Sequence, residues 1–518
     1  MATLKELRDE RLRKLKTLKD MGVNAYPAHT QRSHQLAEII NQFDNLQNQS
    51  VNVVGRIINI RKLGQISFIV IKDETNHLQL FLRKDKMSTP DHNDSQIGYD
   101  EINLLDAGDF IGAKGNVIKT QTGEISVEVE QLRLLTKSLR PMPTSWDGFT
   151  NKEERLRRRY IDLNINKDIH DRFIRRSRFW QATRQYLIDK EFIEINIPVL
   201  EHTTGGADAT PFVTHMDALD QDFYLRISHE LPLKRLIAGG YEKVFDIGPR
   251  FRNENYSEEH LPEHIAMEWY WAYADWRDGM TFMTDMYRNV IQKTFGKLQF
   301  ELNGFKIDLA QEWSEVDYAA LIREHYGLDV YNCNIDEVKK ALAEHKLEVQ
   351  QSKSMVRSID KLWKNIRKDI SGPSWLVNVP LFISPLAKIN PDQPLAVQRF
   401  QAIIAGSELG NGFSELNDPI DQLNRFIEQQ QLRDAGDKEA MMLDIDYVEM
   451  LEYGMPPACG WGYSERVFWA FEGVSAREGV PFPHLRTEFD SVTRSIYADL
   501  FKQKSVNSAL DNEVNKSK

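Results

Sequence analysis

Charged side chains interrupt two apolar stretches between residues 243 and 276, KVFDIGPRFRNENYSEEHLPEHIAMEWYWAYADW. One apolar stretch leads into FRNE, a polar loop follows, and a second apolar stretch returns, which predicts a β-hairpin. Arg252 and Glu254 are two residues apart, so we expect them on the same face of the first strand. Charges buried on a strand are costly unless they are paired or bind a ligand. The two residues are therefore candidates for binding a charged ligand, with a surface ion pair as the alternative.

The hairpin lies in a long region, residues 166–500, that we expect to be one α+β domain. The helical pattern DRFIRRSRFWQATRQYLIDK alternates with strand patterns such as KVFDIG and HIAMEWYWAY. Residues 315–370 are mainly helical in pattern and suggest an insertion. Prolines, a glycine and then dense charge over residues 138–165 predict a linker. The polar tail, residues 501–518, is expected to be disordered.

Residues 51–137 have the pattern of short strands. VNVVGRIINIRK, ISFIVIKD and HLQLFLRK are rich in β-branched and apolar residues, and Gly64 and TQTGE mark turns. About five strands in this length suit a small β-barrel such as an OB-fold. Such barrels commonly bind single-stranded nucleic acid by stacking bases on aromatic side chains, and they also serve as plain scaffolds.

Residues 1–50 are expected to form a helical extension. Leucines recur at three- and four-residue steps over residues 3–20, with basic residues between them. These basic residues form either a phosphate-binding face or an ordinary solvated surface; they are Lys5, Arg8, Arg11, Arg13, Lys14, Lys16 and Lys19.

The composition is that of a globular protein, with 41% hydrophobic and 28% charged residues in a chain of 518. That length is enough for about three domains. The net charge of −11 argues against binding nucleic acid through bulk charge, but it allows a local basic face. The cysteines, Cys333 and Cys459, form no CxxC pair, so neither a disulfide framework nor a cysteine-rich zinc site is expected. Without a signal-peptide pattern or a membrane-spanning apolar run, a cytoplasmic location is expected.

Several motifs, taken in order, resemble the class II aminoacyl-tRNA synthetases, and specifically the bacterial lysyl enzymes. FRNE followed by HLPEHIAMEWYWAYAD resembles motif 2, FIEINIPVL with Pro198 resembles the dimer-forming motif 1, and GMPPACGWGYSER resembles motif 3. NKEERLRRRYIDL, TTGGADATPFVTH and LGNGFSELNDPIDQ are similar to further segments of these enzymes. The resemblance covers nearly all of residues 1–490. It implies an OB-fold barrel followed by a catalytic domain built on an antiparallel sheet with helices.

The resemblance implies an ATP site. Arg252 and Arg466 are the expected catalytic residues: Arg252 bridges the amino-acid carboxylate and the α-phosphate, and Arg466 holds the phosphate tail. Glu254 would accept from the adenine amino group, and His260 would contact the outer phosphates. His264 stands at the position of an aromatic residue that stacks on adenine. Joining two anions requires positioning and electrostatic neutralisation, which arginine forks supply.

The resemblance also implies a lysine site. Glu415 and Tyr270 would hold the ε-ammonium, and Phe413 would pack on the aliphatic stem. A buried anion is the physical answer to an ammonium in a pocket, whereas an aspartyl enzyme needs a cation there. The other expected lysine-binding residues are Gly206 and Glu230 at the α-amino group, Asn411 and Arg252 at the carboxylate, and Glu268 in the same strand cluster.

Within the barrel, Phe68 and Gln79 match positions that read the middle anticodon base, and Arg56 matches a nearby contact. Phe68 would stack on the base and Gln79 would bond its edge. Without the resemblance, Phe68 would be assigned to the core and Gln79 to the surface.

Departures from the family pattern gather around ATP. In the family, two carboxylates bind magnesium with the ATP phosphates. This chain has Glu408 at one of these positions and Gln401 at the other, and the neutral amide of Gln401 makes this metal site doubtful. Pro249 and Glu259 replace expected basic residues. Motif 3 is one residue short in GWGYSER.

The resemblance therefore implies a ligase that forms lysyl-adenylate from lysine and ATP and transfers the lysyl group to tRNA(Lys), with Mg²⁺ accompanying ATP. A homodimer is expected. The rival hypotheses are an asparaginyl- or aspartyl-type ligase, which shares the barrel and the catalytic fold, and a non-catalytic paralogue that binds RNA.

Overall fold

The structure is a computed structural model that describes residues 3–143, 149–254, 260–348 and 355–502. The chain divides into two units: residues 1–151 with 485–518, and residues 152–484. The helices α4 (Lys152–Arg157) and α5 (Arg159–Ile165) belong to the second unit, although their composition suggested a linker. The buried guanidinium of Arg159 explains this, because it pairs with Asp162 at 2.8 Å and donates to the carbonyl of Pro481. Glu259 and residues 503–518 of the expected tail lie outside the described residues.

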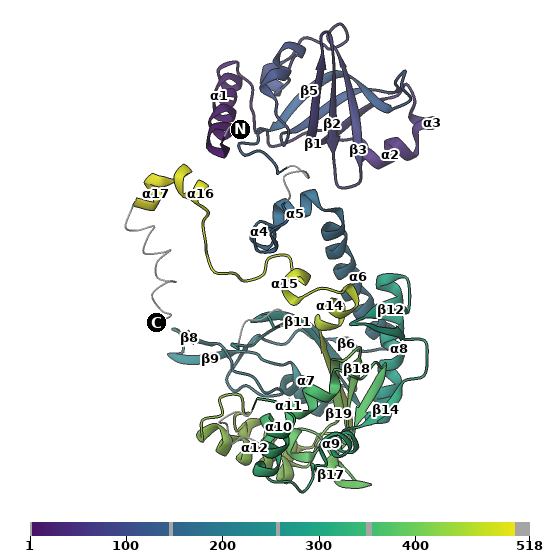
Figure 1. Cartoon of the computed structure of the whole chain (residues 1–518), viewed down its shortest axis with the longest axis vertical. Helices are drawn as coiled ribbons and strands as arrows, with labels where there is room; N and C mark the ends of the chain where they lie inside the picture. The colour runs from purple at the N-terminus through teal and green to yellow at the C-terminus, as the bar shows by residue number, and fades with distance from the viewer. Residues whose placement is uncertain (1–2, 144–148, 255–259, 349–354, 503–518) are drawn as a thin grey trace. The chain divides into compact units, whose positions relative to one another are not determined.

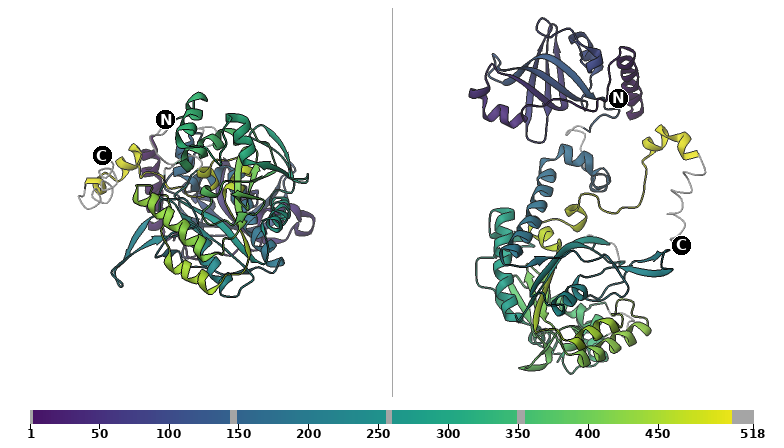
Figure 2. Two further views of the ribbon diagram at one scale, coloured as in Figure 1. Left: turned by 90° about the horizontal axis from the view of Figure 1, so that it is seen from below. Right: turned by 180° about the vertical axis from the view of Figure 1, so that it is seen from behind.

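The first unit contains a β-barrel made of β1 (Ser50–Leu63), β2 (Ile66–Lys72), β3 (His77–Arg83), β4 (Phe110–Lys119) and β5 (Ile125–Thr136) (Figure 1). The strands close in the order β1-β2-β3-β5-β4. Strands β3 and β5 are parallel, and the other neighbours are antiparallel. Side chains alternate along each strand, so that Ile69 and Leu80 fill the interior while their neighbours face outward. The barrel expected from the strand pattern is confirmed, and Figure 2 shows it from behind.

The helix α1 (Leu4–Asp20) confirms the helical N-terminal segment. Thr3 caps it, and Leu15 and Leu18 are buried in the core of the barrel unit. Neither alternative for the basic residues, a phosphate-binding face or a solvated surface, holds for Arg11, which is buried and donates to the carbonyl of Ala107 at 2.8 Å. Lys14 also pairs with Asp106 at 2.7 Å. Further elements of this unit are α2 (Leu36–Asn41), α3 (Phe43–Leu46), η1 (His92–Asp94), η2 (Tyr99–Leu104), α16 (Ser491–Ile496) and α17 (Ala498–Lys502).

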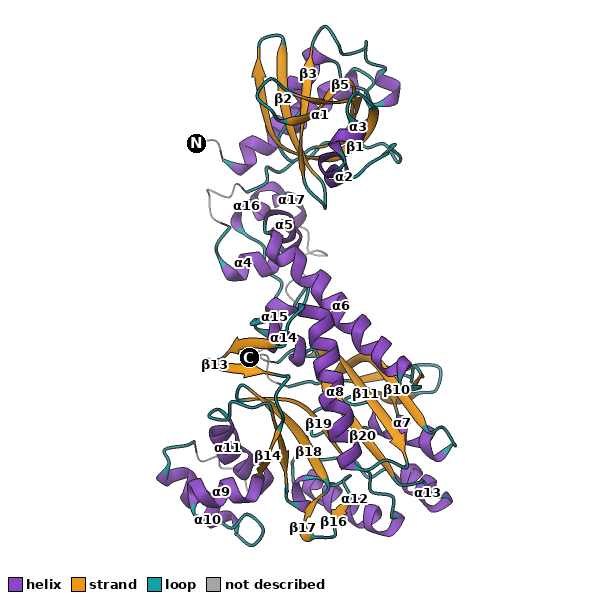
Figure 3. Cartoon of the chain, turned by 90° about the vertical axis from the view of Figure 1, so that its right-hand side faces the viewer, coloured by secondary structure: helices purple, strands orange, loops and turns teal. Residues whose placement is uncertain are grey.

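The second unit is organised by a sheet in the order β14-β15-β18-β19-β20-β11-β10-β6 (Figure 3). Its strands are β6 (Ile193–Glu194), β10 (Lys243–Phe251), β11 (Glu263–Ala272), β14 (Ser314–Asp317), β15 (Ser374–Val377), β18 (Arg399–Ile404), β19 (Ser407–Ser414) and β20 (Ala458–Ser464). The sheet is antiparallel from β15 to β10, as expected, and parallel at both edges, β14–β15 and β10–β6. The segment FIEINIPVL contains β6 and the first residue of β7 (Leu200–Glu201), so it is not one continuous strand.

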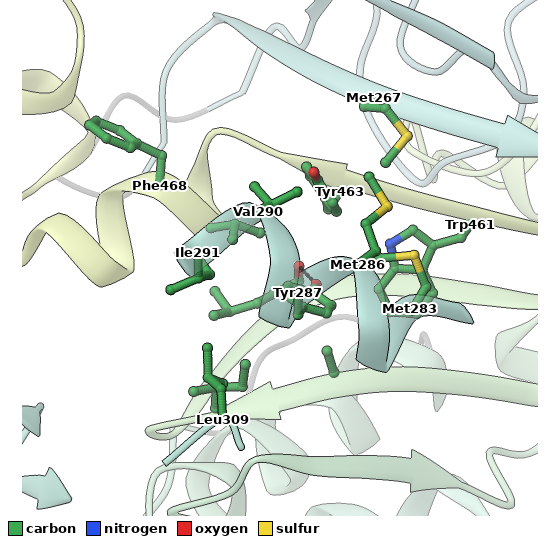
Figure 4. Packing of buried hydrophobic residues seen from close by; sticks show 14 of the residues in the cluster. Met267, Met283, Met286, Tyr287, Val290, Ile291, Leu309, Trp461, Tyr463 and Phe468 are labelled. Atoms are coloured by element: carbon green, nitrogen blue, oxygen red, sulfur yellow. Dashed lines mark hydrogen bonds between the residues drawn. The ribbon is translucent and has the colours of Figure 1, made fainter. Parts of the chain in front are cut away.

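One face of the sheet is covered by α6 (Lys167–Asp189) and α8 (Trp276–Phe295), which lie side by side (Figure 3). Methionine and aromatic side chains fill the layer between α8 and the strands, among them Met283, Met286 and Tyr287 opposite Trp461 and Tyr463 (Figure 4). Burying such side chains contributes about 1.5–3 kcal/mol each. This apolar layer fixes the strands, and the opposite face of the sheet is left for polar side chains.

The expected helical region 315–370 contains α9 (Tyr318–Tyr326), α10 (Ile335–Glu344) and α11 (Met355–Arg367). It connects the parallel strands β14 and β15, and its own apolar cluster includes Ile322, Leu342 and Leu362. It is therefore a crossover that belongs to the sheet.

The remaining elements of the second unit are β8 (Val213–Met216), β9 (Gln221–Leu225), α7 (Glu230–Ala238), β12 (Gln299–Leu302), β13 (Phe305–Asp308), η3 (Leu381–Ile383), β16 (Ile389–Asn390), β17 (Gln393–Val397), α12 (Pro419–Asp434), α13 (Ile445–Tyr453), α14 (Arg466–Glu472) and α15 (Ala476–Gly479). Among the described residues, each helix is too short or too polar to span a bilayer.

Candidate active site

A cavity of about 920 Å³ lies on the sheet face opposite α8. The alternation of side chains along β11 explains its lining, because Met267 and Trp269 enter the α8 layer while Glu268 and Tyr270 line the cavity. The structure brings together in this cavity every candidate that the sequence placed in the catalytic domain: Gly206, Glu230, Arg252, Glu254, His260, His264, Glu268, Tyr270, Gln401, Glu408, Asn411, Phe413, Glu415 and Arg466.

Glycines allow the acidic end of the cavity to close tightly. A Cβ on Gly460 would lie 2.3 Å from both Glu415 Oε1 and the Tyr270 ring. Gly206 has a φ of +83°, and a Cβ there would lie 2.7 Å from the Cβ of Glu230. Both positions therefore require glycine, one for close approach and the other also for its backbone conformation.

The acidic end gathers the carboxylates of Glu230, Glu268 and Glu415. Glu268 accepts from Ser228 Oγ at 2.9 Å, from the backbone N–H of His229 at 3.1 Å, and from Tyr270 OH at 3.3 Å. Glu230 and Glu415 instead share one internal cation, the ammonium of Lys234. Both oxygens of Glu415 are buried and accept no aligned hydrogen bond from the described residues, although Lys234 lies beside them.

Lys234 was not identified from the sequence. It lies four residues after Glu230 on α7, pairs with it at 2.6 Å, and has its ammonium 5.1 Å from the centre of the Phe413 ring. Burial opposes its charge, but Glu230 and Glu415 outweigh this effect and raise the pKa of Lys234. Burial raises the pKa of Glu415 well above its ordinary value, with Lys234 acting in the opposite direction. The only sequence signal was the i,i+4 spacing of Glu230 and Lys234, which many exposed helices share.

Arginines gather at the other end of the cavity. Strand β10 ends at Phe251, so Arg252 and Glu254 follow the strand and are not on one strand face as expected. The backbone N–H of Arg252 donates to the Pro262 carbonyl at 2.9 Å. Its Nε is buried and has no partner among the described residues. A buried donor without a partner is costly, so this atom is suited to an anionic ligand.

Arg250 adds a cation that the motif comparison did not predict. It is paired with His264 across the β10–β11 hairpin, and its Nε donates to His264 Nε2 at 2.7 Å. Burial and the neighbouring Arg252 lower the pKa of Arg250 to about 9. Burial and both arginines also lower the pKa of His264 well below its ordinary value, so the ring is neutral. At the start of α14, Arg466 Nη2 lies 3.4 Å from His260 Nε2.

The middle of the cavity is shaped by β18 and β19. Arg399 donates to Asn411 Oδ1 at 2.7 Å and to Ser384 Oγ at 2.7 Å. Asn411 is paired with Gln401 across the two strands. The orientation of Asn411 is thus fixed by Arg399, a further cation that the motifs did not predict.

The residues expected to hold a metal do not fit a protein-bound Mg²⁺. Oε1 of Glu408 already accepts from Trp363 Nε1 at 2.6 Å and pairs with Arg367 at 3.3 Å. Gln401 offers a neutral amide. No cluster of three or more acidic, histidine or cysteine side chains suited to a metal occurs in the part of the chain that the structure describes. Magnesium prefers hard anionic oxygens, and a positive guanidinium beside the one carboxylate opposes its binding.

In the barrel, Phe68 and Gln79 lie on the outward faces of the paired strands β2 and β3. The assignment of Phe68 to the core does not hold, because it is half-buried and stacks on Phe81 with ring centroids 5.2 Å apart. Gln79 donates to Ser126 Oγ at 2.9 Å. On β1, Arg56 donates to the Gly108 carbonyl at 3.2 Å and lies over the Phe110 ring.

Family models of known proteins match both structural units of the chain. The model of the class II tRNA synthetases (D, K and N) matches residues 151–486, and the model of the OB-fold nucleic acid binding domain matches residues 51–135. A lysine–tRNA ligase of Fervidobacterium nodosum is 39% identical over 97% of this chain and 98% of its own length. A lysine–tRNA ligase of Roseiflexus sp. (strain RS-1) is 40% identical over 93% of this chain and 99% of its own length. The protein is a member of the class II tRNA synthetases of the D, K and N group.

Proposed function

We propose that this protein is a lysine–tRNA ligase that activates lysine with ATP and transfers the lysyl group to the 3′ end of tRNA(Lys). The observation that carries this proposal is the buried acidic end of the cavity, where Glu415 and Glu230 share the ammonium of Lys234. The names of the relatives support the same amino acid.

The charge of this end suits a substrate with two ammonium groups. The carboxylates of Glu230, Glu268 and Glu415 outnumber the two cations beside them, Lys234 and Arg250, which lies 3.9 Å from Glu268, and burial raises the pKa of Glu230 and Glu415. A bound lysine would add cations that favour the ionised carboxylates. Its ε-ammonium would lie against Glu415 and Tyr270, its stem against Phe413, and its α-amino group near Glu230 and Gly206.

The arginine end suits the reacting anions. The reaction joins the lysine carboxylate to the α-phosphate of ATP and releases pyrophosphate. Arg252 would bridge the two reacting groups and Arg466 would hold the departing phosphates, so that catalysis is electrostatic and needs no protein nucleophile. Glu254 and His264 would bind the adenine, with His260 beside Arg466. Magnesium would enter on the phosphates of ATP itself.

The barrel is the proposed anticodon-binding surface. Phe68 with Phe81 offers a stacking platform on the outer face, and Gln79 and Arg56 offer donors beside it.

A homodimer formed through the segment around Pro198 is also proposed, and sedimentation at micromolar concentration tests it. A species of only about 60 kDa would contradict the dimer.

The rival assignments lack such support. An aspartyl-type ligase needs a cation that is available to its substrate carboxylate, whereas the buried ammonium of Lys234 is already paired with Glu230 and Glu415. A non-catalytic paralogue has no physical reason to keep these carboxylates opposite Arg252 and Arg466 in one cavity.

The decisive experiment is ATP–pyrophosphate exchange, run separately with lysine, asparagine and aspartate. We expect exchange with lysine and none with aspartate. Exchange with asparagine or aspartate alone would overturn the assignment, and exchange with no amino acid would support the non-catalytic alternative.

A further inference from the structure

The cavity contains an internal cation at the position where the family pattern suggests a metal. Trp363 and Arg367 are one helical turn apart on α11, so they project from the same side of the helix. Both contact the carboxylate of Glu408 on β19: Trp363 Nε1 donates at 2.6 Å, and Arg367 Nη1 lies at 3.3 Å. Arg367 Nε also donates to the carbonyl of Gly406 at 3.0 Å. Two fixed contacts thus hold the guanidinium at the wall of the cavity.

The charge of Glu408 is stabilised mainly by this cation. Burial raises the pKa of Glu408, but Arg367 and the Trp363 hydrogen bond outweigh it, so its pKa is lowered. Gln401, on the neighbouring strand β18, also lines the cavity; it carries no charge and is 8% exposed. Arg399 lies on the same strand as Gln401 and adds a further positive charge. Both contacts are to Oε1 of Glu408, so a metal ion on this carboxylate would share it with the positive charge of Arg367 and would meet an amide and a second guanidinium.

We propose that Arg367 is a phosphate-binding residue that acts in place of a protein-held magnesium ion, with Glu408 and Trp363 as its positioning residues. This inference rests on the proposed function, because it takes ATP as the substrate. An arginine is always charged, and its planar fork suits two phosphate oxygens. Among the described residues, Nη2 of Arg367 has no hydrogen-bond partner, which leaves a donor for the ligand. The enzyme would then bind nucleotide without needing a metal ion on its own side chains.

Nucleotide binding tests the proposal without turnover. Titration calorimetry with a non-hydrolysable ATP analogue is run on the full chain in Mg²⁺ and in EDTA. We expect the wild-type Kd to rise by less than about tenfold in EDTA, and Arg367→Gln to weaken binding in EDTA by about tenfold or more. Arg367→Lys, which keeps the charge, should retain part of the affinity. Lys361→Gln on the same helix is the control, because Lys361 pairs with Glu348 and does not line the cavity.

Metal binding to the nucleotide-free enzyme provides the second readout. The free Mn²⁺ signal in electron paramagnetic resonance should be unchanged by wild-type enzyme. Arg367→Gln combined with Gln401→Glu should bind Mn²⁺, since two carboxylates are then available. Circular dichroism checks that each variant is folded, and Trp363→Phe offers a milder change that removes one contact to Glu408.

The outcomes separate this inference from the proposed function. Tight Mn²⁺ binding by wild type that Glu408→Gln abolishes would overturn the role of Arg367, as would unchanged nucleotide affinity in Arg367→Gln. If nucleotide binding follows the expected pattern while lysine supports no pyrophosphate exchange, the lysine assignment fails and the inference about Arg367 stands.

Discussion

Lys234 and Glu415 form a buried ion pair, from α7 to the end of β19, at the position where a substrate ammonium is proposed to bind. Neither carboxylate oxygen of Glu415 accepts an aligned hydrogen bond within the described residues. Glu415 is therefore held by an internal cation but keeps acceptor capacity for a ligand. Gly460 makes this possible, because any side chain there would collide with Glu415 and Tyr270.

Replacing Glu415 tests the lysine site directly. Glu415→Gln should lower kcat/KM for lysine in pyrophosphate exchange, because the substrate ammonium loses its buried counter-charge. The corresponding loss of transition-state stabilisation should be about 2–5 kcal/mol. Glu449→Gln, which changes an exposed carboxylate on α13, is the matched control and should behave as wild type. Equal kinetics in the two variants would exclude Glu415 from the site.

Removing Lys234 should destabilise the protein. Lys234→Met leaves Glu230 and Glu415 buried without their cation, and breaking such a pair costs about 3–5 kcal/mol. Urea unfolding measures the change, and L-lysine should raise the Tm of the variant because it returns an ammonium to the pocket. Lys340→Met, at an exposed lysine on α10, is the control. If Lys234→Met is as stable as this control, the ion pairs of Lys234 make no net contribution to the free energy of unfolding.

Lysine binding should depend on pH through Glu415. Its pKa is raised by burial, so protonation begins at a higher pH than for an ordinary glutamate, whose pKa is about 4.3. The protonated carboxyl is neutral and cannot pair with an ammonium. We therefore expect KM for lysine to rise as pH falls through the raised pKa, and Glu415→Gln to flatten this rise. A wild-type KM that stays constant down to the ordinary glutamate pKa would contradict the expectation.

Replacing the barrel residue Phe68 should weaken tRNA binding and leave lysine activation unchanged. Phe68→Ala removes one ring of the Phe68–Phe81 stack and should weaken tRNA(Lys) binding by about 1–3 kcal/mol. Filter binding measures this, and pyrophosphate exchange without tRNA should be unchanged. Ile69→Ala, in the barrel interior, is the comparison for structural damage. Equal losses of tRNA binding and lysine activation would indicate a structural role for Phe68.

The local periodicity of apolar residues was sufficient to predict the main secondary-structure elements. Strand alternation over residues 51–137 predicted the barrel, and the apolar stretches around FRNE predicted the β10–β11 hairpin, because both depend on the side-chain period of a strand. The strand end at Phe251 was missed, because pattern places an element's boundary less accurately than its existence.

Motif resemblance supplied the expected ligand contacts, Arg252, Glu415 and Tyr270 among them, and the fold brings them to one cavity. The sequence by itself could determine which residue types are present and in which elements they lie. The tertiary structure decided which charges meet. Lys234 reaches Glu415 and Arg367 reaches Glu408 because the crossover and the sheet bring distant segments together. Such pairs have no local period, and only the folded chain shows that Glu408 already holds a cation.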